Sequence, residues 1–444
     1  MRKGYCITRM CDKYAIVVPI DCFLEDAKLF ADERTVNFTD FSSIKDLDFS
    51  FECLKSGPDV YAFYPFLVTM NDLGILNQLM RIKSGSSKDY TDAEYIEKLK
   101  KRYVRLNYLV DSENHDIEAV LNAKAFPEPE KKYHPKKCDV IRVNSKPIEE
   151  VKIAVANTLL FEADFDKVLK DLPNRKYSRY DKFQNIVNEA IRQKADMLVL
   201  PEGYLPFEWL PILARTCAKN QMAVVTGVEH LKISKKNSDP IVSNLTAVIL
   251  PFVEGNYKFS YIHFHNKVHL APHEKEKIES YGCVANKGDR YELYNWNDFW
   301  FSVYCCFELT SIYDRSMFQA YADAIIAVEW NRDTNYYSNI VESLSRDLHC
   351  FCIQVNTSEF GDSRITIPSK TETKDLLKVK GGKNPAILLD TIDITGLRNF
   401  QLKGHALQEK SADGKKYKPT PPDFNYDVVR KKIHRTLWDD LDTI

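Results

Sequence analysis

The chain reads VYCCFEL over residues 303–309, an apolar strand that ends on a reactive thiol. Two other segments share this character. Residues 198–202 read LVLPE, an apolar strand that ends on a carboxylate, and residues 266–270 read NKVHL, which sets a lysine beside a histidine. Active sites of α/β sheets gather at the carboxyl ends of strands. The three segments therefore predict an α/β fold in which an acid, an ammonium and a thiol meet.

Around these segments, from residue 150 onward, short apolar runs alternate with stretches of helical spacing. We expect strands at 151–156, 196–200, 223–228, 244–251, 257–263, 300–306, 324–328, 350–356, 364–368 and 384–390. We expect helices at 180–194, 209–219, 316–322 and 337–348. This mixture indicates sheets covered by helices on one face and by another sheet on the other.

The 444 residues exceed what one hydrophobic core normally supports, so two units are expected. The charged, proline-rich residues 126–137 are typical of a connector. We therefore predict an N-terminal region at residues 1–145, α/β or mostly helical and of unknown role. The main domain is expected at 146–400, and residues 401–444 are expected to form a C-terminal arm with a helix over 428–438.

Composition excludes several classes of protein. The 62 basic and 63 acidic residues argue against a dominant nucleic-acid footprint, and only the basic face expected on a helix at 92–110 weakly supports such contact. No apolar run approaches the roughly 18 residues of a membrane span. The 11 cysteines form no zinc-type pairs, so we expect no metal and no cofactor. Free thiols are typical of a reducing, cytoplasmic setting.

The three reactive side chains can divide the work of a cysteine hydrolase. Glu202 can serve as the general base, and Lys267 can stabilise a thiolate and then an oxyanion. Cys306 can serve as the nucleophile, with the backbone N–H that follows it completing the oxyanion site. Each residue also has an ordinary structural interpretation: a carboxylate that caps a helix, a lysine in a surface salt bridge, and a core cysteine.

The order of the segments resembles the nitrilase, or carbon–nitrogen hydrolase, superfamily over residues 150–395. Residues 196–202 resemble its base segment and residues 265–270 its lysine segment. Residues 303–309 resemble its nucleophile elbow, and Phe307-Glu308 then select Cys306 rather than Cys305 as the nucleophile. The resemblance implies a four-layer αββα sandwich. It also implies metal-free hydrolysis of non-peptide carbon–nitrogen bonds in amides, nitriles or N-carbamoyl compounds through a thioester.

The resemblance also implies further site residues and partners. A second glutamate after the lysine segment is expected at Glu274, with Glu276 as the alternative. Phe307 and Trp330 are expected to contact a small-molecule substrate, while Glu308 is expected to be structural. Homo-oligomers are common in the family.

Two other functions stay open. The chain could be a catalytically altered, nitrilase-like binding or scaffold module, because residues 310–312 read TSI where amidase-like branches have Arg-Phe-Pro. It could also be part of a bacterial defence or nucleic-acid-associated effector, given the unassigned N-terminal region.

Overall fold

The computed structural model describes residues 17–19, 35–37, 60–63, 130–134, 138–143, 146–235, 238–254, 257–410 and 416–440. Two compact units divide the chain, Met1–Glu128 and Pro129–Ile444. In the first unit, three short antiparallel strands form a sheet in the order β1-β3-β2: β1 Val17–Pro19, β2 Thr35–Asn37 and β3 Val60–Phe63. The helix expected at 92–110 lies outside the described residues.

The second unit contains a six-stranded sheet in the order β12-β11-β8-β7-β6-β20. Its strands are β6 Glu150–Asn157, β7 Met197–Leu205, β8 Ala223–Val228, β11 Leu245–Glu254, β12 Tyr257–Asn266 and β20 Ala386–Asp393. Strands β6, β7 and β8 are parallel. Because β11 is antiparallel to both β8 and β12, β12 runs in the same direction as β7. The carboxyl ends of β7, β8 and β12 therefore share one edge of this sheet.

An eight-stranded sheet follows the order β19-β18-β17-β16-β15-β14-β5-β4. Its strands are β4 Glu130–His134, β5 Cys138–Val143, β14 Tyr291–Trp296, β15 Phe299–Cys305, β16 Ala324–Glu329, β17 Phe351–Asn356, β18 Ser363–Thr366 and β19 Asp375–Val379. Strands β15, β16 and β17 are parallel. Their carboxyl ends therefore share one edge as well.

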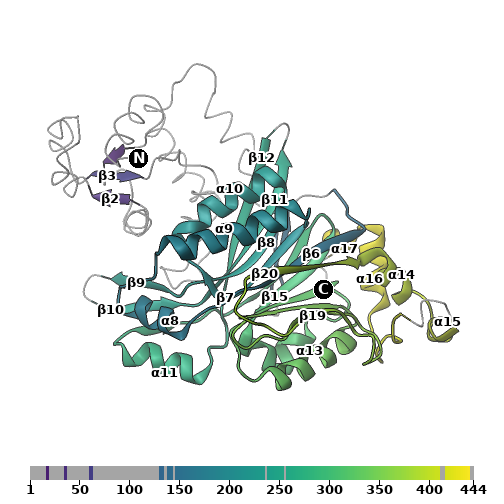
Figure 1. Cartoon of the computed structure of the whole chain (residues 1–444). Coiled ribbons are helices and arrows are strands. Elements are labelled where there is room, and N and C mark those ends of the chain that lie inside the picture. Colours follow the sequence, from purple (N-terminus) through teal and green to yellow (C-terminus); the bar gives the residue numbers. More distant parts are fainter. Residues whose placement is uncertain are drawn as a thin grey trace, which may run out of the picture. The chain divides into compact units, whose positions relative to one another are not determined.

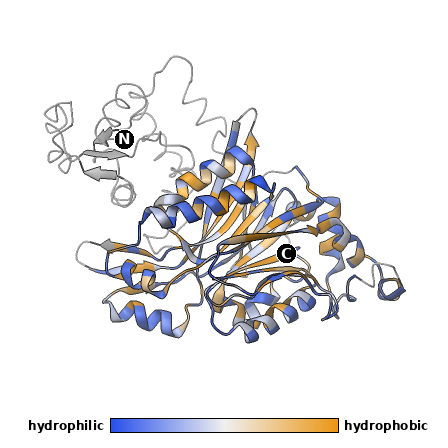
Figure 2. Cartoon of the chain, viewed as in Figure 1, coloured by the Kyte–Doolittle hydropathy of each residue, from blue (hydrophilic) through white to orange (hydrophobic). Residues whose placement is uncertain are grey.

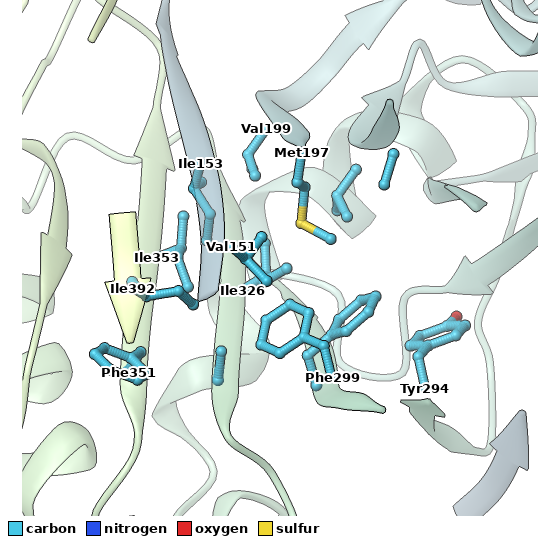
Figure 3. Close-up of a cluster of buried hydrophobic side chains, with 14 of the residues drawn as sticks. Val151, Ile153, Met197, Val199, Tyr294, Phe299, Ile326, Phe351, Ile353 and Ile392 are labelled. Carbon is cyan, nitrogen blue, oxygen red and sulfur yellow. The ribbon is translucent and has the colours of Figure 1, made fainter. Parts of the chain in front are cut away.

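The two sheets pack face to face through one large apolar core. Alternate residues of β6 and β7, among them Ile153 and Val199, meet alternate residues of β15 and β16, such as Phe299 and Ile326. Figure 3 shows these side chains projecting from both sheets into the same layer. Strands that are buried on both faces read as nearly continuous apolar runs, which is why the sequence shows them so clearly.

Helices cover the outer faces of both sheets (Figure 1). On the six-stranded sheet, α9 (Tyr177–Arg192) and α10 (Leu210–Asn220) pack on the strands, and α9 buries the predicted stripe that includes Phe183 and Val187. On the eight-stranded sheet, α13 (Thr334–Leu348) packs over β17 and β18. In Figure 2 the central strands are largely orange, whereas α9 carries much blue. The four-layer αββα sandwich is therefore confirmed.

Smaller elements surround the carboxyl ends of the strands. They are α8 Glu162–Leu169, the 3₁₀ turn η2 Phe207–Trp209, α11 Pro272–Ser280, the 3₁₀ turn η3 Cys306–Thr310, α12 Ile312–Ser316 and a sheet of β9 Leu231–Lys235, β10 Ser238–Ser243 and β13 Val284–Asn286. None of the described helices is both long and apolar enough to cross a bilayer.

Two local predictions were wrong. The helix expected at 316–322 lies earlier, at α12, where the Ser311 hydroxyl accepts a hydrogen bond from the Asp314 N–H. The chain then turns, and Ala320 has a φ of 66°, which a right-handed helix cannot accommodate. The connector expected at 126–137 contains the edge strand β4, and β5 follows it, so the second unit begins before residue 146. An edge strand pairs on one side only and tolerates the charged composition of a loop.

The C-terminal residues fold onto the domain as peripheral helices, two of which lie where a helix was predicted over 428–438. They contain α14 Ile394–Gln401, α15 His405–Lys410, α16 Tyr426–His434 and α17 Leu437–Asp440. Val428 and Trp438 lie in the apolar cluster on the outer face of the eight-stranded sheet. The Lys432 ammonium is fully buried against Asp323, at 2.8 Å. Apolar residues spaced between charges gave no sign of this docking in the sequence.

Candidate active site

The three predicted side chains all lie at the shared carboxyl edge of the two sheets. Glu202 lies in the last half of β7, Lys267 directly follows β12, and Cys306 directly follows β15. Residues 65 apart in the sequence thus come into direct contact, because the Lys267 Nζ lies 2.8 Å from the Glu202 Oε1. Face-to-face packing of the two sheets then brings the β15 end against the β7 and β12 ends.

A bulge in β7 positions Glu202. The pairing of β7 with β8 shifts register between Leu200 and Leu205, so the strand bends over the glutamate. The facing residue of β8 is Gly227, where a Cβ atom would lie 2.3 Å from the Glu202 Cα. Only glycine allows this approach. The bulge therefore depends on a small residue that the sequence alone gave no reason to select.

Lys267 lies between two carboxylates. Its Nζ donates to the Glu202 Oε1 and to the Glu274 Oε2, both at 2.8 Å. Burial opposes the charge on this side chain, but the two glutamates outweigh burial and hold the Lys267 pKa well above its ordinary value. An ammonium has three N–H donors. The contacts to Glu202 and Glu274 use two of them, which leaves one N–H for a substrate oxygen.

Asn244 joins the same two carboxylates from the other side. Its Nδ2 donates to the Glu202 Oε1 at 2.8 Å and to the Glu274 Oε1 at 2.6 Å. The His230 Nε2 lies 2.9 Å from the Glu274 Oε1. Burial raises the pKa of Glu274, but Lys267 and then His230 lower it more, so that this carboxyl stays ionised. Glu274 is therefore a fixed counter-charge for Lys267.

Cys306 lies at a strained turn. Its φ is 48°, in the left-handed region that non-glycine residues rarely adopt, and the 3₁₀ turn η3 starts there. Such conformations cluster at active sites because the surrounding structure must hold them in place. The Cys306 side chain keeps the alternation of β15, because Tyr304 and Cys306 belong to the outer apolar cluster, whereas Val303 and Cys305 belong to the core between the sheets. Cys305 faces the core between the sheets, whereas Cys306 contacts the cluster that includes Tyr337 on α13.

The Cys306 thiol lies within electrostatic range of the two other predicted residues. Burial is the largest influence on its pKa and raises it well above the ordinary value; Glu202 raises it further, and Lys267 lowers it. The Trp330 backbone N–H also faces this thiol and lowers the pKa. The resting Cys306 group is therefore a neutral thiol and not a preformed thiolate.

The other predicted site residues differ in position. Glu276 is exposed, so the structure brings Glu274 and not Glu276 to Lys267. Trp330 is half-buried, and its N–H donates to the Glu202 Oε2 at 3.0 Å. Phe307 is half-buried in the nucleophile turn itself. Contact of Phe307 and Trp330 with a substrate stays a prediction.

Glu308 is structural, as expected. It is fully buried, and its carboxylate accepts the backbone N–H groups of Val268, at 2.5 Å, and of Cys305, at 2.6 Å. It also contacts the His265 Nε2, at 2.9 Å. Glu308 thus connects the lysine segment with the nucleophile turn.

Several site residues were missed from the sequence. Asn244 and His230 lie next to strand ends, which was the only available signal, and polar residues at strand ends are common. Glu329, at the end of β16, was also missed. It is fully buried, and burial raises its pKa to about 8. Among the described residues, no group of three His, Cys, Asp or Glu side chains is arranged to hold a metal ion.

No protein-family model and no curated protein matches this sequence. Solved structures do resemble it. A CN-hydrolase superfamily protein from Xanthomonas campestris, with an arsenic adduct in its active site, is 13% identical at a TM-score of 0.43, covering 60% of this chain and 98% of its own.

Two others are similar at comparable levels. An amidase of the nitrilase superfamily from Nesterenkonia, in a mutant form, is 14% identical at a TM-score of 0.39, covering 57% of this chain and 95% of its own. Nit3 of Saccharomyces cerevisiae, a member of branch 10 of the nitrilase superfamily, is 13% identical at a TM-score of 0.41. The match covers 61% of this chain and 98% of Nit3. Because all three TM-scores are below 0.5, the chemistry of this chain has to be argued from its own side chains.

Proposed function

We propose that this chain hydrolyses non-peptide carbon–nitrogen bonds of small amides, nitriles or N-carbamoyl compounds through a thioester on Cys306. The single observation that carries the proposal is the pair of 2.8 Å contacts that hold Lys267 between Glu202 and Glu274, beside a buried thiol in a strained turn. These two contacts use two of the three Lys267 N–H donors, so that the third remains for a substrate oxygen.

The first half of the reaction follows from the protonation states. Glu202 takes the proton of the Cys306 thiol as the sulfur attacks the substrate carbon, since the high thiol pKa keeps the resting group neutral. The negative charge that develops on the substrate oxygen is stabilised by the remaining Lys267 N–H and by the backbone N–H after Cys306. Glu202 then gives its proton to the leaving nitrogen, and an amide substrate becomes a thioester and an amine.

The second half reverses these roles. Glu202 removes a proton from a water molecule, which attacks the thioester carbon, and the proton passes to the sulfur as the acid is released. Glu274, Asn244 and the Trp330 N–H keep the base in place through both halves, because each contacts Glu202 directly or through Lys267. The overall reaction consumes one water for an amide or N-carbamoyl substrate and two for a nitrile, whose thioimidate adds a first water before the amine leaves; no other reactant is needed.

A binding or scaffold module without catalysis is the second candidate. One observation favours it: Cys306 is buried, with only 8% of its surface exposed, so that a substrate has to reach it through a narrow opening. The two candidates differ in whether a covalent intermediate forms.

The test is to trap the thioester by mass spectrometry with a panel of amides, nitriles and carbamoyl compounds. We expect a mass increase on the peptide that contains Cys306 for one substrate class, and none in Cys306→Ala. Turnover should fall at least about 10⁴-fold in that variant, as it does when other enzymes lose their nucleophile.

The matched control is Cys305→Ala, which removes a buried thiol one residue away that faces the core between the sheets and contacts the Asn244 Oδ1 at 3.8 Å. It should retain the adduct. An adduct on Cys305, or turnover that survives Cys306→Ala, would contradict the assignment, and a panel that yields neither adduct nor turnover would favour the binding module.

A further inference from the structure

A second group of buried charged side chains lies directly behind the proposed catalytic residues. His265, on β12, has its Nδ1 2.8 Å from the Glu292 Oε2 of β14 and its Nε2 2.9 Å from the Glu308 Oε2. The His265 and Glu308 side chains are fully buried, and that of Glu292 is 7% exposed. We call these three residues the imidazole brace. The mechanism proposed above uses none of them.

The brace contacts both halves of the site through the backbone. Glu308 accepts the N–H of Val268, the residue after Lys267, and the N–H of Cys305, the residue before Cys306. One carboxylate therefore fixes the position of the ammonium segment relative to the thiol turn. His265 in turn fixes the carboxylate, and its own ring stacks on Tyr291 at 5.6 Å.

We propose that His265 is a positioning residue that holds the Cys306 turn against Glu202 and Lys267 by orienting Glu308. The inference rests on the proposed function and adds a residue to it. Without His265, Glu308 would lose a charged partner in the protein interior, and the strained Cys306 turn would lose the support of its neighbour's N–H bond. Misplacement of a reacting group by about 1 Å can cost on the order of 100-fold in rate.

The charge of the brace supports this role. Burial opposes protonation of His265, but Glu308 and then Glu292 outweigh it and raise the pKa of the imidazole to about 10. Both ring nitrogens then carry protons, so that each donates to one carboxylate. Asp139, on β5, is the other charged group that faces Glu292, and it raises the pKa of that carboxyl together with burial.

The chain offers a matched control two residues away. His263 lies on the same strand and the same face, and it is also buried, but its Nδ1 contacts the Tyr294 hydroxyl at 2.9 Å rather than a site carboxylate. A change at His263 alters the packing of the same region without removing the link to the nucleophile turn.

The experiment measures the rate at which iodoacetamide labels Cys306, by peptide mass spectrometry, in the full-length protein. Iodoacetamide alkylates a thiol at its CH2 carbon with loss of iodide, so the labelling rate reports how readily Cys306 loses its proton to a base and acts as a nucleophile. The variants are His263→Gln, His265→Gln and His265→Gln/Glu292→Gln, each with and without Glu202→Gln. The double variant removes one positive and one negative charge together, so that it folds even where the single variant leaves too much buried charge unpaired.

We expect labelling to slow roughly 10–100-fold in the His265 variants and to stay within about twofold in His263→Gln. Glu202→Gln should slow labelling in the wild-type and His263 backgrounds but add little in the His265 backgrounds, because the thiol no longer sits against its base. A merely structural role of His265 would lower thermal stability and leave the effect of Glu202→Gln unchanged.

The outcomes separate the two claims. Wild-type Cys306 that labels no faster than the other cysteines, and that ignores Glu202→Gln, overturns the proposed function. A wild-type thiol that depends on Glu202, combined with His265 variants that label at the wild-type rate or respond fully to Glu202→Gln, overturns the positioning role alone.

Discussion

Two clusters of buried charge lie in the same domain, and they are built differently. At the carboxyl edge of the sheets, Lys267 stands between Glu202 and Glu274, with one N–H left for a further contact. At the start of β16, Asp323 accepts two bonds from Arg398, at 2.9 and 2.6 Å, one from Lys432, at 2.8 Å, and one from the Trp300 N–H, at 3.0 Å.

The balance of hydrogen bonds and charges differs between the two clusters, and this balance indicates the role of each. Both Asp323 oxygens are satisfied, and the two cations Arg398 and Lys432 are balanced by Asp323 and Asp298. Asp323 therefore anchors the C-terminal helices. The cluster around Lys267 has two carboxylates against one ammonium, and the Cys306 thiol near it has a raised pKa. Incomplete compensation of this kind is what an active site requires.

The largest effect is expected when the structural cluster is broken. Asp323→Ala leaves Arg398 and Lys432 buried without their shared partner, which should cost about 3–5 kcal/mol in the free energy of unfolding. Urea unfolding measures it, with Asp323→Asn as a milder variant.

The control is Glu162→Gln, which also contacts two cations, Lys277 and Arg332, but is 54% exposed. It should cost less than about 1 kcal/mol. If both variants lost the same free energy of unfolding, burial would not explain the difference between the two ion-pair sites.

The next effect compares the two buried lysines. Lys267→Met removes the only cation that contacts Glu202 and Glu274 among the described residues, and turnover should fall about 10²–10³-fold because oxyanion stabilisation is lost. Lys432→Met leaves Asp323 paired with Arg398, so turnover should stay within about twofold, with stability lowered by about 1–2 kcal/mol. Rates on the substrate identified by thioester trapping provide the measurement. A Lys432→Met protein that folds but has no turnover would contradict the different roles assigned to the two clusters.

The smallest effect is a difference in pH dependence between two buried histidines. The pKa of His265 is raised from 6.5 to about 10, so the stability it provides is complete below pH 6.5 and is lost as pH rises toward 10. The pKa of His349 is lowered to about 4 by burial, so its contribution is complete above pH 6.5 and is lost as pH falls toward 4. One proton changes the free energy of unfolding by about 1.4 kcal/mol per pH unit.

Urea unfolding across the pH range checks both slopes. His265→Gln/Glu292→Gln should flatten the alkaline side and leave the acid side unchanged, and His349→Gln should do the reverse. If either variant flattens both sides, the assignment of the two slopes is wrong.

Much of the fold was predictable, for a local reason. Strands such as β7 and β17 are apolar on both faces, and α9 carries its buried stripe at helical spacing, so the pattern within each element is enough. The wrong secondary-structure predictions concern segments whose hydrophobic pattern is weak. The edge strand β4 has the composition of a loop, and the helix predicted at 316–322 is replaced by turns that include a left-handed residue, Ala320.

The site was predictable in part. The positions of Glu202, Lys267 and Cys306 came from residue type at the ends of strands and from family resemblance. The roles of Asn244, His230 and His265 were not predicted. A single polar residue cannot be distinguished from the many others in the sequence until its partner in the fold is known. The choice of Glu274 over Glu276 also needed the structure, because only the turn of α11 decides which one faces Lys267.

The sequence by itself determined the strands, the main helices and the three reactive residue types, because hydrophobic periodicity and side-chain chemistry are properties of short segments. Only the tertiary structure decided which polar side chains meet and which buried charges are fully compensated. Those outcomes depend on contacts between residues far apart in the chain, such as the 65 positions that separate Glu202 from Lys267, and on the burial that makes each uncompensated charge costly.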